Sequence, residues 1–233
     1  MPNKFLLISY IEGVSPNDVL IKVCHNEASN IFNSIGRTLR KVHTIKLKSF
    51  GNPLTNEKID YHEYLKGKLS SRLNSSKKYL SNIEYDSILS MLNKCDPIVE
   101  NECSKSPVIT HRDVYADNFI IENKTANAYI IDFAMAEGGS PFYDLGKLYI
   151  SDIYRFPQFH SSFIRGYFDE KIIPRKERSL ILYSIILELT GQLGWYGSIK
   201  NKKYLEKSLQ KIKEISRNEG ILWELLFNKK HLY

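Results

Sequence analysis

The stretch HRDVYADNFIIENKTANAYIID, residues 111–132, decides the fold of this chain. Two apolar runs, Phe119 to Glu122 and Ala128 to Asp132, lie on either side of a short polar segment. Apolar runs joined in this way predict two short strands and the turn between them. Because a hairpin leaves and returns at neighbouring positions, we expect Asn118 and Asp132 at the same end of it.

Three polar side chains of this stretch suit the transfer of a phosphoryl group. That reaction asks a protein mainly for positioning and charge neutralisation. The carboxylate of Asp113 can accept the proton of an acceptor hydroxyl. Asn118 offers a neutral amide oxygen and Asp132 an anionic one, and hard oxygen ligands are those that Mg²⁺ prefers. The spacing therefore predicts Asp113 as the base, and Asn118 and Asp132 as metal ligands.

Other polar residues near this stretch have simpler interpretations. His111 is expected to shape the loop through hydrogen bonds rather than to act as a base. Asp117 is expected to be a turn former that satisfies local backbone groups. We expect Asp144 to cap or brace the helix beginning near Tyr143, not to bind metal. Glu188, inside a long apolar helix, is a candidate contact for the acceptor.

The same stretch resembles the catalytic loop and metal-binding strand of the kinase-like fold. Within that fold it is similar to the aminoglycoside phosphotransferase and choline-kinase-like family of small-molecule kinases. Three further segments agree in order. Phe5 to Gly13 resembles the hinge between the two lobes, Ile35 to His43 the helix that follows it, and Gly138 to Gly146 the segment that leaves the metal site and enters a buried helix.

The resemblance implies ATP and Mg²⁺ as cofactors and a small-molecule hydroxyl as the acceptor. It also implies that the backbone of Ser9, Tyr10 and Ile11 contacts adenine. A protein kinase carries a long peptide-docking segment after its metal-binding Asp. Only 11 residues (144 − 132 − 1) separate Asp132 from Asp144, so the chain has too little room for that platform. A small acceptor is therefore favoured.

The apparent hinge is reached within ten residues of Met1. We therefore expect residues 1–12 to be a hinge strand and residues 13–233 to be a kinase-like C-terminal lobe, with most of the nucleotide lobe absent. Gly138-Gly139, and Gly191 with Gly194, lack the strand and helix that flank a phosphate loop. Two alternatives stay open: a catalytically impaired remnant or binding module, and a kinase of another metabolite such as choline, a sugar or homoserine.

Composition restricts the class of protein. The chain has 233 residues, 42% of them hydrophobic, which is enough for one sizeable core. A charged fraction of 25% and a mean hydropathy of −0.32 argue against membrane residence. Three cysteines, an odd number, predict reduced thiols in the cytoplasm. The net charge of +7 is spread over scattered lysines, so it predicts solvated helix faces rather than nucleic-acid binding, and it disfavours a polycationic acceptor.

Helical spacing of apolar residues predicts helices over most of the remaining chain. One begins at Ser15-Pro16, and others cover 27–44, 61–73, 85–92, 143–153, 159–168, 176–195, 202–215 and 221–227, with a strand at 4–10. Asp96-Pro97 is expected to end the helix that starts at Tyr85. The predicted fold class is α+β and mainly helical: a protein-kinase-like C-terminal lobe with a small catalytic β-hairpin.

Overall fold

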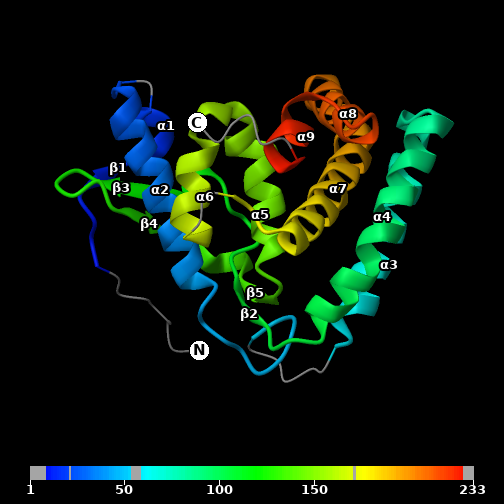
Figure 1. The fold of residues 1–233 in the computed structure, drawn as a ribbon, viewed down its shortest axis with the longest axis horizontal. Coiled ribbons are helices and arrows are strands. Elements are labelled where there is room, and N and C mark those ends of the chain that lie inside the picture. Colours follow the sequence, from blue (N-terminus) through cyan, green and yellow to red (C-terminus); the bar gives the residue numbers. More distant parts are fainter. Residues whose placement is uncertain (1–8, 21, 54–58, 170–171, 228–233) are drawn as a thin grey trace, which may run out of the picture.

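The computed structural model describes residues 9–20, 22–53, 59–169 and 172–227 (Figure 1). The strands are β1 (Gly13–Val14), β2 (Val108–Thr110), β3 (Phe119–Glu122), β4 (Ala128–Ile130) and β5 (Glu137–Gly139). The α-helices are α1 (Pro16–Val19), α2 (His25–Val42), α3 (Tyr61–Ser76), α4 (Asn82–Cys103), α5 (Phe142–Leu148), α6 (His160–Phe168), α7 (Arg175–Ser198), α8 (Lys202–Ser216) and α9 (Gly220–Phe227). A π-helical turn, η4 (Tyr149–Ile153), continues α5, and 3-10 turns are η1 (Lys77–Tyr79), η2 (Ala116–Asn118), η3 (Phe133–Met135) and η5 (Pro157–Phe159). The fold is α+β and mainly helical, as predicted.

The predicted hairpin is present. β3 and β4 pair antiparallel, with Phe119 opposite Ile130, and β1 adds a third strand on the other side of β3. A side chain at Gly13 of β1 would collide with the carbonyl of Ile121, so only glycine lets these two strands approach. β2 and β5 form a second antiparallel pair. β1, β2 and β5 were not predicted, because two or three residues are too few to show an alternating pattern.

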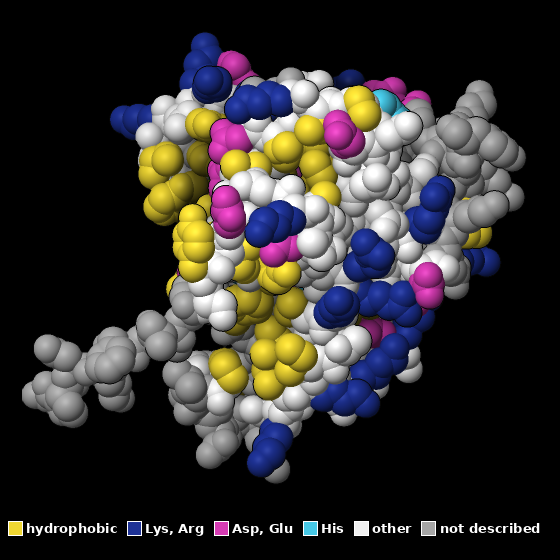
Figure 2. All heavy atoms as spheres, turned by 90° about the vertical axis from the view of Figure 1, so that its left-hand side faces the viewer, with side chains coloured by type: hydrophobic (Ala, Val, Ile, Leu, Met, Phe, Trp, Pro, Cys, Tyr) yellow, Lys and Arg dark blue, Asp and Glu magenta, His cyan; other side chains and the backbone are white. Residues whose placement is uncertain are grey.

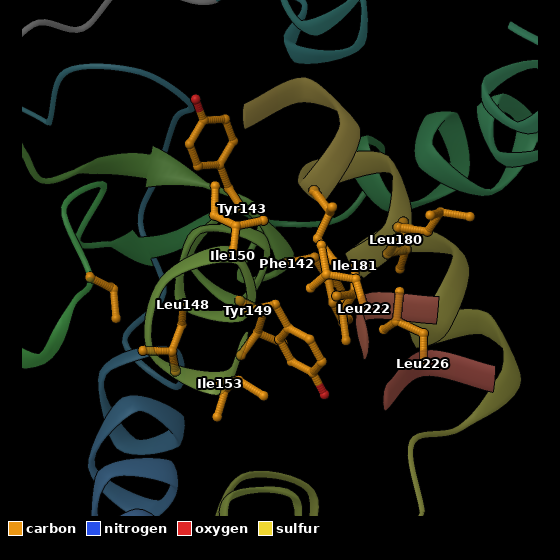
Figure 3. Close-up of a cluster of buried hydrophobic side chains, with 14 of the residues drawn as sticks. Phe142, Tyr143, Leu148, Tyr149, Ile150, Ile153, Leu180, Ile181, Leu222 and Leu226 are labelled. Carbon is orange, nitrogen blue, oxygen red and sulfur yellow. The ribbon is translucent and has the colours of Figure 1, made fainter. Parts of the chain in front are cut away.

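The core is one cluster with buried side chains from each of the helices α2 to α9. Side chains of α5 and η4 pack against α7 and α9, with Tyr149, Ile153 and Ile181 among the fully buried ones (Figure 3). Burying a side chain of this size stabilises the fold by about 1.5–3 kcal/mol. α3 and α4 lie at one edge of the molecule and the β3–β4 hairpin at the opposite edge (Figure 1).

Two sequence predictions about element ends need correction. α4 does not end before Pro97 but runs through it to Cys103. Pro97 removes one backbone donor, which costs up to about 3 kcal/mol in a helix interior. The buried stripe of α4 nevertheless continues from Ile88 beyond Pro97 to Val99, and this packing outweighs the local preference. Of the strand expected at 4–10, residues 4–8 lie outside the described residues, and Ser9 and Tyr10 are not in a strand.

One face of the molecule shows how charged side chains lie on the surface. On the side that carries α1 and the three-stranded sheet, Lys and Arg side chains are interspersed with Asp and Glu and with hydrophobic groups (Figure 2). Several Lys and Arg side chains gather toward the lower right of this view (Figure 2). In the part of the chain that the structure describes, no helix combines the length and the apolarity needed to cross a bilayer.

Candidate active site

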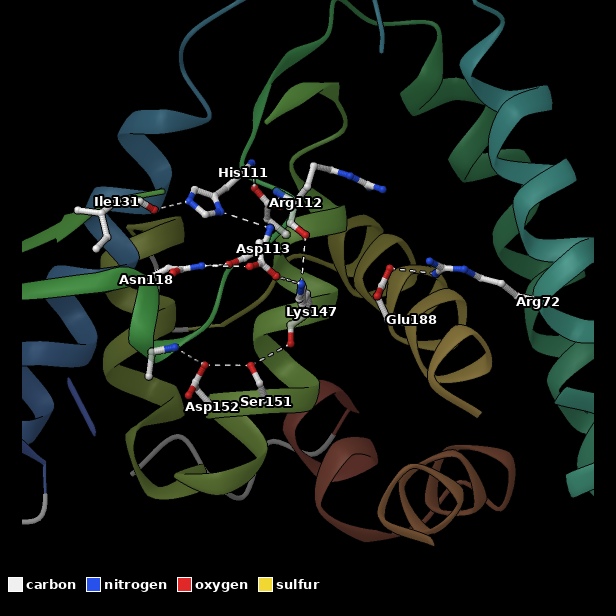
Figure 4. Close-up of polar contacts among 12 residues, drawn as sticks. Arg72, His111, Arg112, Asp113, Asn118, Ile131, Lys147, Ser151, Asp152 and Glu188 are labelled. Carbon is white, nitrogen blue, oxygen red and sulfur yellow. Dashed lines mark hydrogen bonds and ion pairs between the residues drawn. The ribbon is translucent and has the colours of Figure 1, made fainter. Parts of the chain in front are cut away.

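The loop between β2 and β3, called here the catalytic loop (residues 111–118), brings two of the predicted site residues together. The side-chain amide of Asn118 donates hydrogen bonds to the main-chain oxygen of Asp113 at 2.7 Å and to its Oδ2 at 3.3 Å (Figure 4). Asn118 is buried at the end of the 3-10 turn η2, so its position is fixed by the fold. With Nδ2 turned toward Asp113, its Oδ1 is the atom left for a metal.

Asp132 follows the end of β4 and lies beside the same loop. The backbone N–H of Ile131 donates to the main-chain oxygen of Asn118 at 2.9 Å, which brings the residue preceding Asp132 against the loop. The side chain of Asp132 is exposed, and its Oδ1 accepts only a long 3.4 Å bond from the N–H of Ala134. The charges of Asp113 and Asp132 both raise the pKa of Tyr115, after the larger effect of burial. Asp113 and Asn118 are thus in contact, and Asp132 follows a residue that is hydrogen-bonded to the same loop.

The oxygens offered here fit a hard divalent cation. The carboxylate of Asp132 and the amide oxygen of Asn118, the two predicted ligands, match the donor preferences of Mg²⁺, which also keeps several waters. Among the described residues, no three His, Cys, Asp or Glu side chains gather as a metal site. The predicted set does not need three such residues, because its neutral ligand is an asparagine. Among the described residues, the hydrogen bond of the Asp132 side chain is the long one from Ala134, so its carboxylate stays a candidate metal ligand.

A lysine that the sequence did not single out contacts the predicted base. The ammonium of Lys147, on α5, forms an ion pair with Oδ1 of Asp113 (Figure 4). It also donates to the main-chain oxygen of Arg112 at 3.2 Å. Lys147 therefore neutralises Asp113 and leaves its Oδ2 facing Asn118. The two partners lie 34 positions apart in the sequence, which explains why no local pattern revealed the pair.

His111 is a structural hydrogen bonder, as predicted. Its Nε2 lies 2.7 Å from the main-chain oxygen of Ile131, so this nitrogen donates, and its Nδ1 accepts from the N–H of Asp113 at 3.3 Å. Both ring nitrogens are thus used in tying the loop to β4. The next residue, Arg112, has a positive φ of 71°, and Asp132 has 61°. Such backbone costs on the order of 1–3 kcal/mol and persists only where the surroundings hold it.

Asp144 is the residue that holds the catalytic loop in place. Its Oδ2 accepts from the backbone N–H of His111 at 2.6 Å and faces Nε2 of His43 at 3.1 Å, while its Oδ1 accepts from the N–H of Arg112 at 2.8 Å. Burial alone would raise the pKa of Asp144, but these hydrogen bonds together outweigh it and hold the pKa below its ordinary value. We call His43, His111 and Asp144 the loop brace. Asp144 braces the catalytic loop, not the helix that was expected.

Two further aspartates fasten the other end of the loop. Asp152, on the π-helical turn, accepts from the N–H of Ala116 at 3.0 Å, and burial raises its pKa (Figure 4). Asp117 accepts from the side chain of Asn17 at 2.6 Å and from Ser15 at 3.3 Å. The expectation that Asp117 serves local backbone groups was therefore wrong. It joins the loop to α1, about a hundred residues earlier in the chain.

The remaining predicted residues lie elsewhere. Tyr10 is 90% exposed, Ser9 is exposed and Ile11 is partly exposed, and their contact with adenine stays a prediction. Glu188 of α7 pairs with Arg72 of α3 at 3.0 Å (Figure 4). Burial would raise the pKa of Glu188, but Arg72 and a hydrogen bond from Tyr143 hold it below its usual value.

Comparison with known proteins identifies the family. A model of the phosphotransferase enzyme family APH matches residues 2–179. The chain belongs to this APH family. It is a phosphotransferase of the type that acts on small-molecule hydroxyls. No curated protein sequence matches the chain significantly.

Solved structures agree with the APH family assignment. A choline/ethanolamine kinase family protein from Mesorhizobium loti superposes with a TM-score of 0.61 at 16% identity, over 97% of this chain and 71% of that one. A thermostable mutant of aminoglycoside phosphotransferase APH(4)-Ia, in a ternary complex with ADP and hygromycin B, superposes with a TM-score of 0.65 at 13% identity, over 89% of this chain and 70% of that one. An ethanolamine kinase from Plasmodium vivax superposes with a TM-score of 0.54 at 14% identity, over 90% of this chain and 63% of that one. At such identities these matches establish the kinase-like fold.

Proposed function

We propose that this chain transfers the terminal phosphoryl group of ATP to a hydroxyl group of a small molecule. Asp113 takes the hydroxyl proton as the acceptor oxygen forms its bond to the γ-phosphorus, and ADP departs with the electrons of the broken bond. Asn118 and Asp132 hold Mg²⁺ beside the phosphates. Residues 1–12 supply the hinge, where Ser9 to Ile11 contact adenine, and residues 13–233 form the lobe that carries the rest, acting in the cytoplasm.

The observation that carries this proposal is the contact between Asp113 and Asn118. A base and a neutral metal ligand lie side by side in a loop that is bonded to the strand ending before Asp132. The loop is also held in an unfavourable backbone conformation by the loop brace, which fits a preorganised site. An ordinary surface turn would need neither this side-chain contact nor this unfavourable backbone conformation.

The metal role is tested by nucleotide binding. Isothermal titration is expected to give Mg²⁺-dependent ATP binding that disappears in Asp132→Ala. The matched control is Asp117→Asn, which changes a neighbouring carboxylate but keeps the oxygen that accepts from Asn17 and Ser15. Equal ATP affinity in Asp132→Ala and wild type would refute the ligand role. No heat with wild type under any condition would favour the alternative of a binding module.

The role of the base is tested by turnover. Release of ADP is measured with a set of hydroxyl compounds that includes choline, ethanolamine, homoserine, a sugar and an aminoglycoside. Asp113→Ala should lose at least a hundredfold in phosphoryl transfer, in line with a general base, while it keeps the Mg²⁺-dependent binding of ATP. Unchanged turnover in Asp113→Ala would remove Asp113 from the mechanism.

A further inference from the structure

A second group of charged side chains adjoins the catalytic loop. We call it the cation cluster: Lys68 and Arg72 of α3, Arg112 of the loop, Glu137 of β5 and Glu188 of α7. Lys68 and Arg72 are four residues apart, so they lie on one face of α3. The side chain of Arg112 points away from Asp113, toward the side where Arg72 and Glu188 meet (Figure 4). The loop thus contributes to both the candidate active site and this cluster.

The two arginines have carboxylate neighbours, but one of them is incompletely satisfied. Arg72 Nη1 lies 3.0 Å from Glu188 and donates to the main-chain oxygen of Leu187 at 2.7 Å. The Nε of Arg112 lies 3.0 Å from Glu137, without the geometry of a hydrogen bond. The side chain of Arg112 is only 9% exposed, and its buried Nη1 finds no partner among the described residues. A buried guanidinium nitrogen without an acceptor is costly unless a ligand supplies one.

Lys68 carries the excess charge. No carboxylate of the described residues lies within ion-pair distance of it. Its Nζ donates to the hydroxyl of Tyr64 at 3.4 Å and lies 5.2 Å from the centroid of the Tyr143 ring. Burial lowers the pKa of Lys68 to about 8, with further lowering by Arg112 and Arg72, while Glu137 and Glu188 act against it. Three cations face two carboxylates, so the cluster has one positive charge more than it has negative ones (3 − 2 = 1).

We propose that the cation cluster binds an anionic group, a carboxylate or a phosphate, of the molecule that is phosphorylated, through Lys68 and Arg112. This inference rests on the proposed function, because it names the class of acceptor for the same site. Arg112 and Asp113 are consecutive residues whose side chains diverge (Figure 4). We place the acidic end of the acceptor at Arg112 and its hydroxyl beside Asp113, the next residue of the same loop.

The charges also argue against a cationic acceptor on this side of the loop. Glu188, the one carboxylate on α7 in the cluster, is already engaged by Arg72 and by a hydrogen bond from Tyr143. An amine entering here would meet Lys68 and Arg112 in a partly buried setting, where repulsion between like charges is stronger than in water. Selection for acids and rejection of amines thus have the same physical cause.

The experiment measures binding to the full chain without nucleotide. Four probes are titrated at constant ionic strength: inorganic phosphate, D-glycerate, glycerol and choline. Phosphate or glycerate should bind, glycerol and choline should not, and whichever acid binds identifies the anionic group. Lys68→Gln should weaken binding about tenfold, as expected for one charge-assisted hydrogen bond. Lys66→Gln is the matched control on α3, because Lys66 is exposed and paired with Glu63.

Two results would overturn the inference: no binding of either acid, or equal binding in Lys68→Gln and Lys66→Gln. Thermal unfolding of both variants checks that each is folded. The result is separable from that of the proposed function. Phosphorylation of choline with Lys68 dispensable would remove the anion site and keep the kinase. Lys68-dependent binding of phosphate in a chain that never binds ATP would keep the anion site and remove the kinase.

Discussion

The loop brace and the cation cluster meet at two consecutive residues, His111 and Arg112. The two groups differ in how fully their charges are compensated. In the loop brace, the carboxylate of Asp144 faces three donors, and both of its oxygens are used. In the cation cluster, Arg112 keeps an unpaired nitrogen and Lys68 has no carboxylate partner among the described residues. The same arginine therefore has its backbone in a satisfied network and its side chain in an unsatisfied one.

This difference suggests a structural role for the loop brace and a binding role for the cation cluster. A satisfied buried network fixes one conformation, because every alternative leaves a polar group unpaired. An unsatisfied one costs free energy in the empty protein and recovers it only when a ligand completes it. We therefore expect substitutions in the loop brace to destabilise the protein strongly. Substitutions in the cation cluster should change the stability of the protein less, and they should change how that stability depends on anions and pH.

The largest effect is expected from Asp144→Asn. An amide cannot serve all three donors, so the buried N–H of His111 or Arg112 loses its acceptor at a cost of about 3 kcal/mol in the free energy of unfolding. Urea denaturation at pH 7 measures this loss. Activity should fall with it, because the catalytic loop keeps its unfavourable backbone only while Asp144 holds it.

The dependence on pH provides the control for this substitution. The folded pKa of Asp144 lies below its unfolded value of about 4. Its stabilisation is therefore complete above pH 4 and is lost as the pH falls through the folded value. The gap between wild type and Asp144→Asn should shrink in acid. A gap that is the same at pH 3 and pH 7 would contradict an ionised Asp144.

The contrast between the two groups also explains what the sequence could predict. Asp113, Asn118 and the β3–β4 hairpin lie within one short segment, where turn residues and spacing carry the information. The predicted role of His111 in shaping the loop was correct for the same reason. Asp144 contacts the loop across 33 residues and Asp117 reaches Asn17 across 100, so no local pattern indicates either partner.

The same limit applies to the helices and to the cation cluster. Pro97 is a local signal for a helix end, yet the packing of α4 overrides it. In the sequence, Lys68 and Arg72 look like ordinary charges on a helix face. They form a cluster because the fold places Arg112, from another part of the chain, near them. Tertiary contacts bring like charges together, and sequence spacing does not report that.

Glu188→Gln is expected to have an intermediate effect. It leaves Arg72 without its carboxylate and the cation cluster with three cations against one anion. The cost should be about 2 kcal/mol, less than for the loop brace because both side chains keep some contact with solvent. Unfolding is compared in phosphate and in chloride at equal ionic strength. Phosphate should restore part of the loss in Glu188→Gln, and an identical phosphate effect in Lys66→Gln would count against a specific site.

Lys68→Met should have the smallest effect, and of opposite sign. In the folded protein the charged form of Lys68 is disfavoured, with a pKa of about 8 against about 10.4 in the unfolded chain. The penalty therefore appears as the pH falls from about 10.4 to 8 and is fully present below 8. At pH 7 the methionine variant should be more stable by about 0.5 kcal/mol, a modest figure because solvent screens a partly exposed lysine. The advantage should vanish near pH 10.5. A variant that is less stable than wild type at pH 7 would mean that Lys68 already has a compensating partner, and the contrast between the loop brace and the cation cluster would then fail.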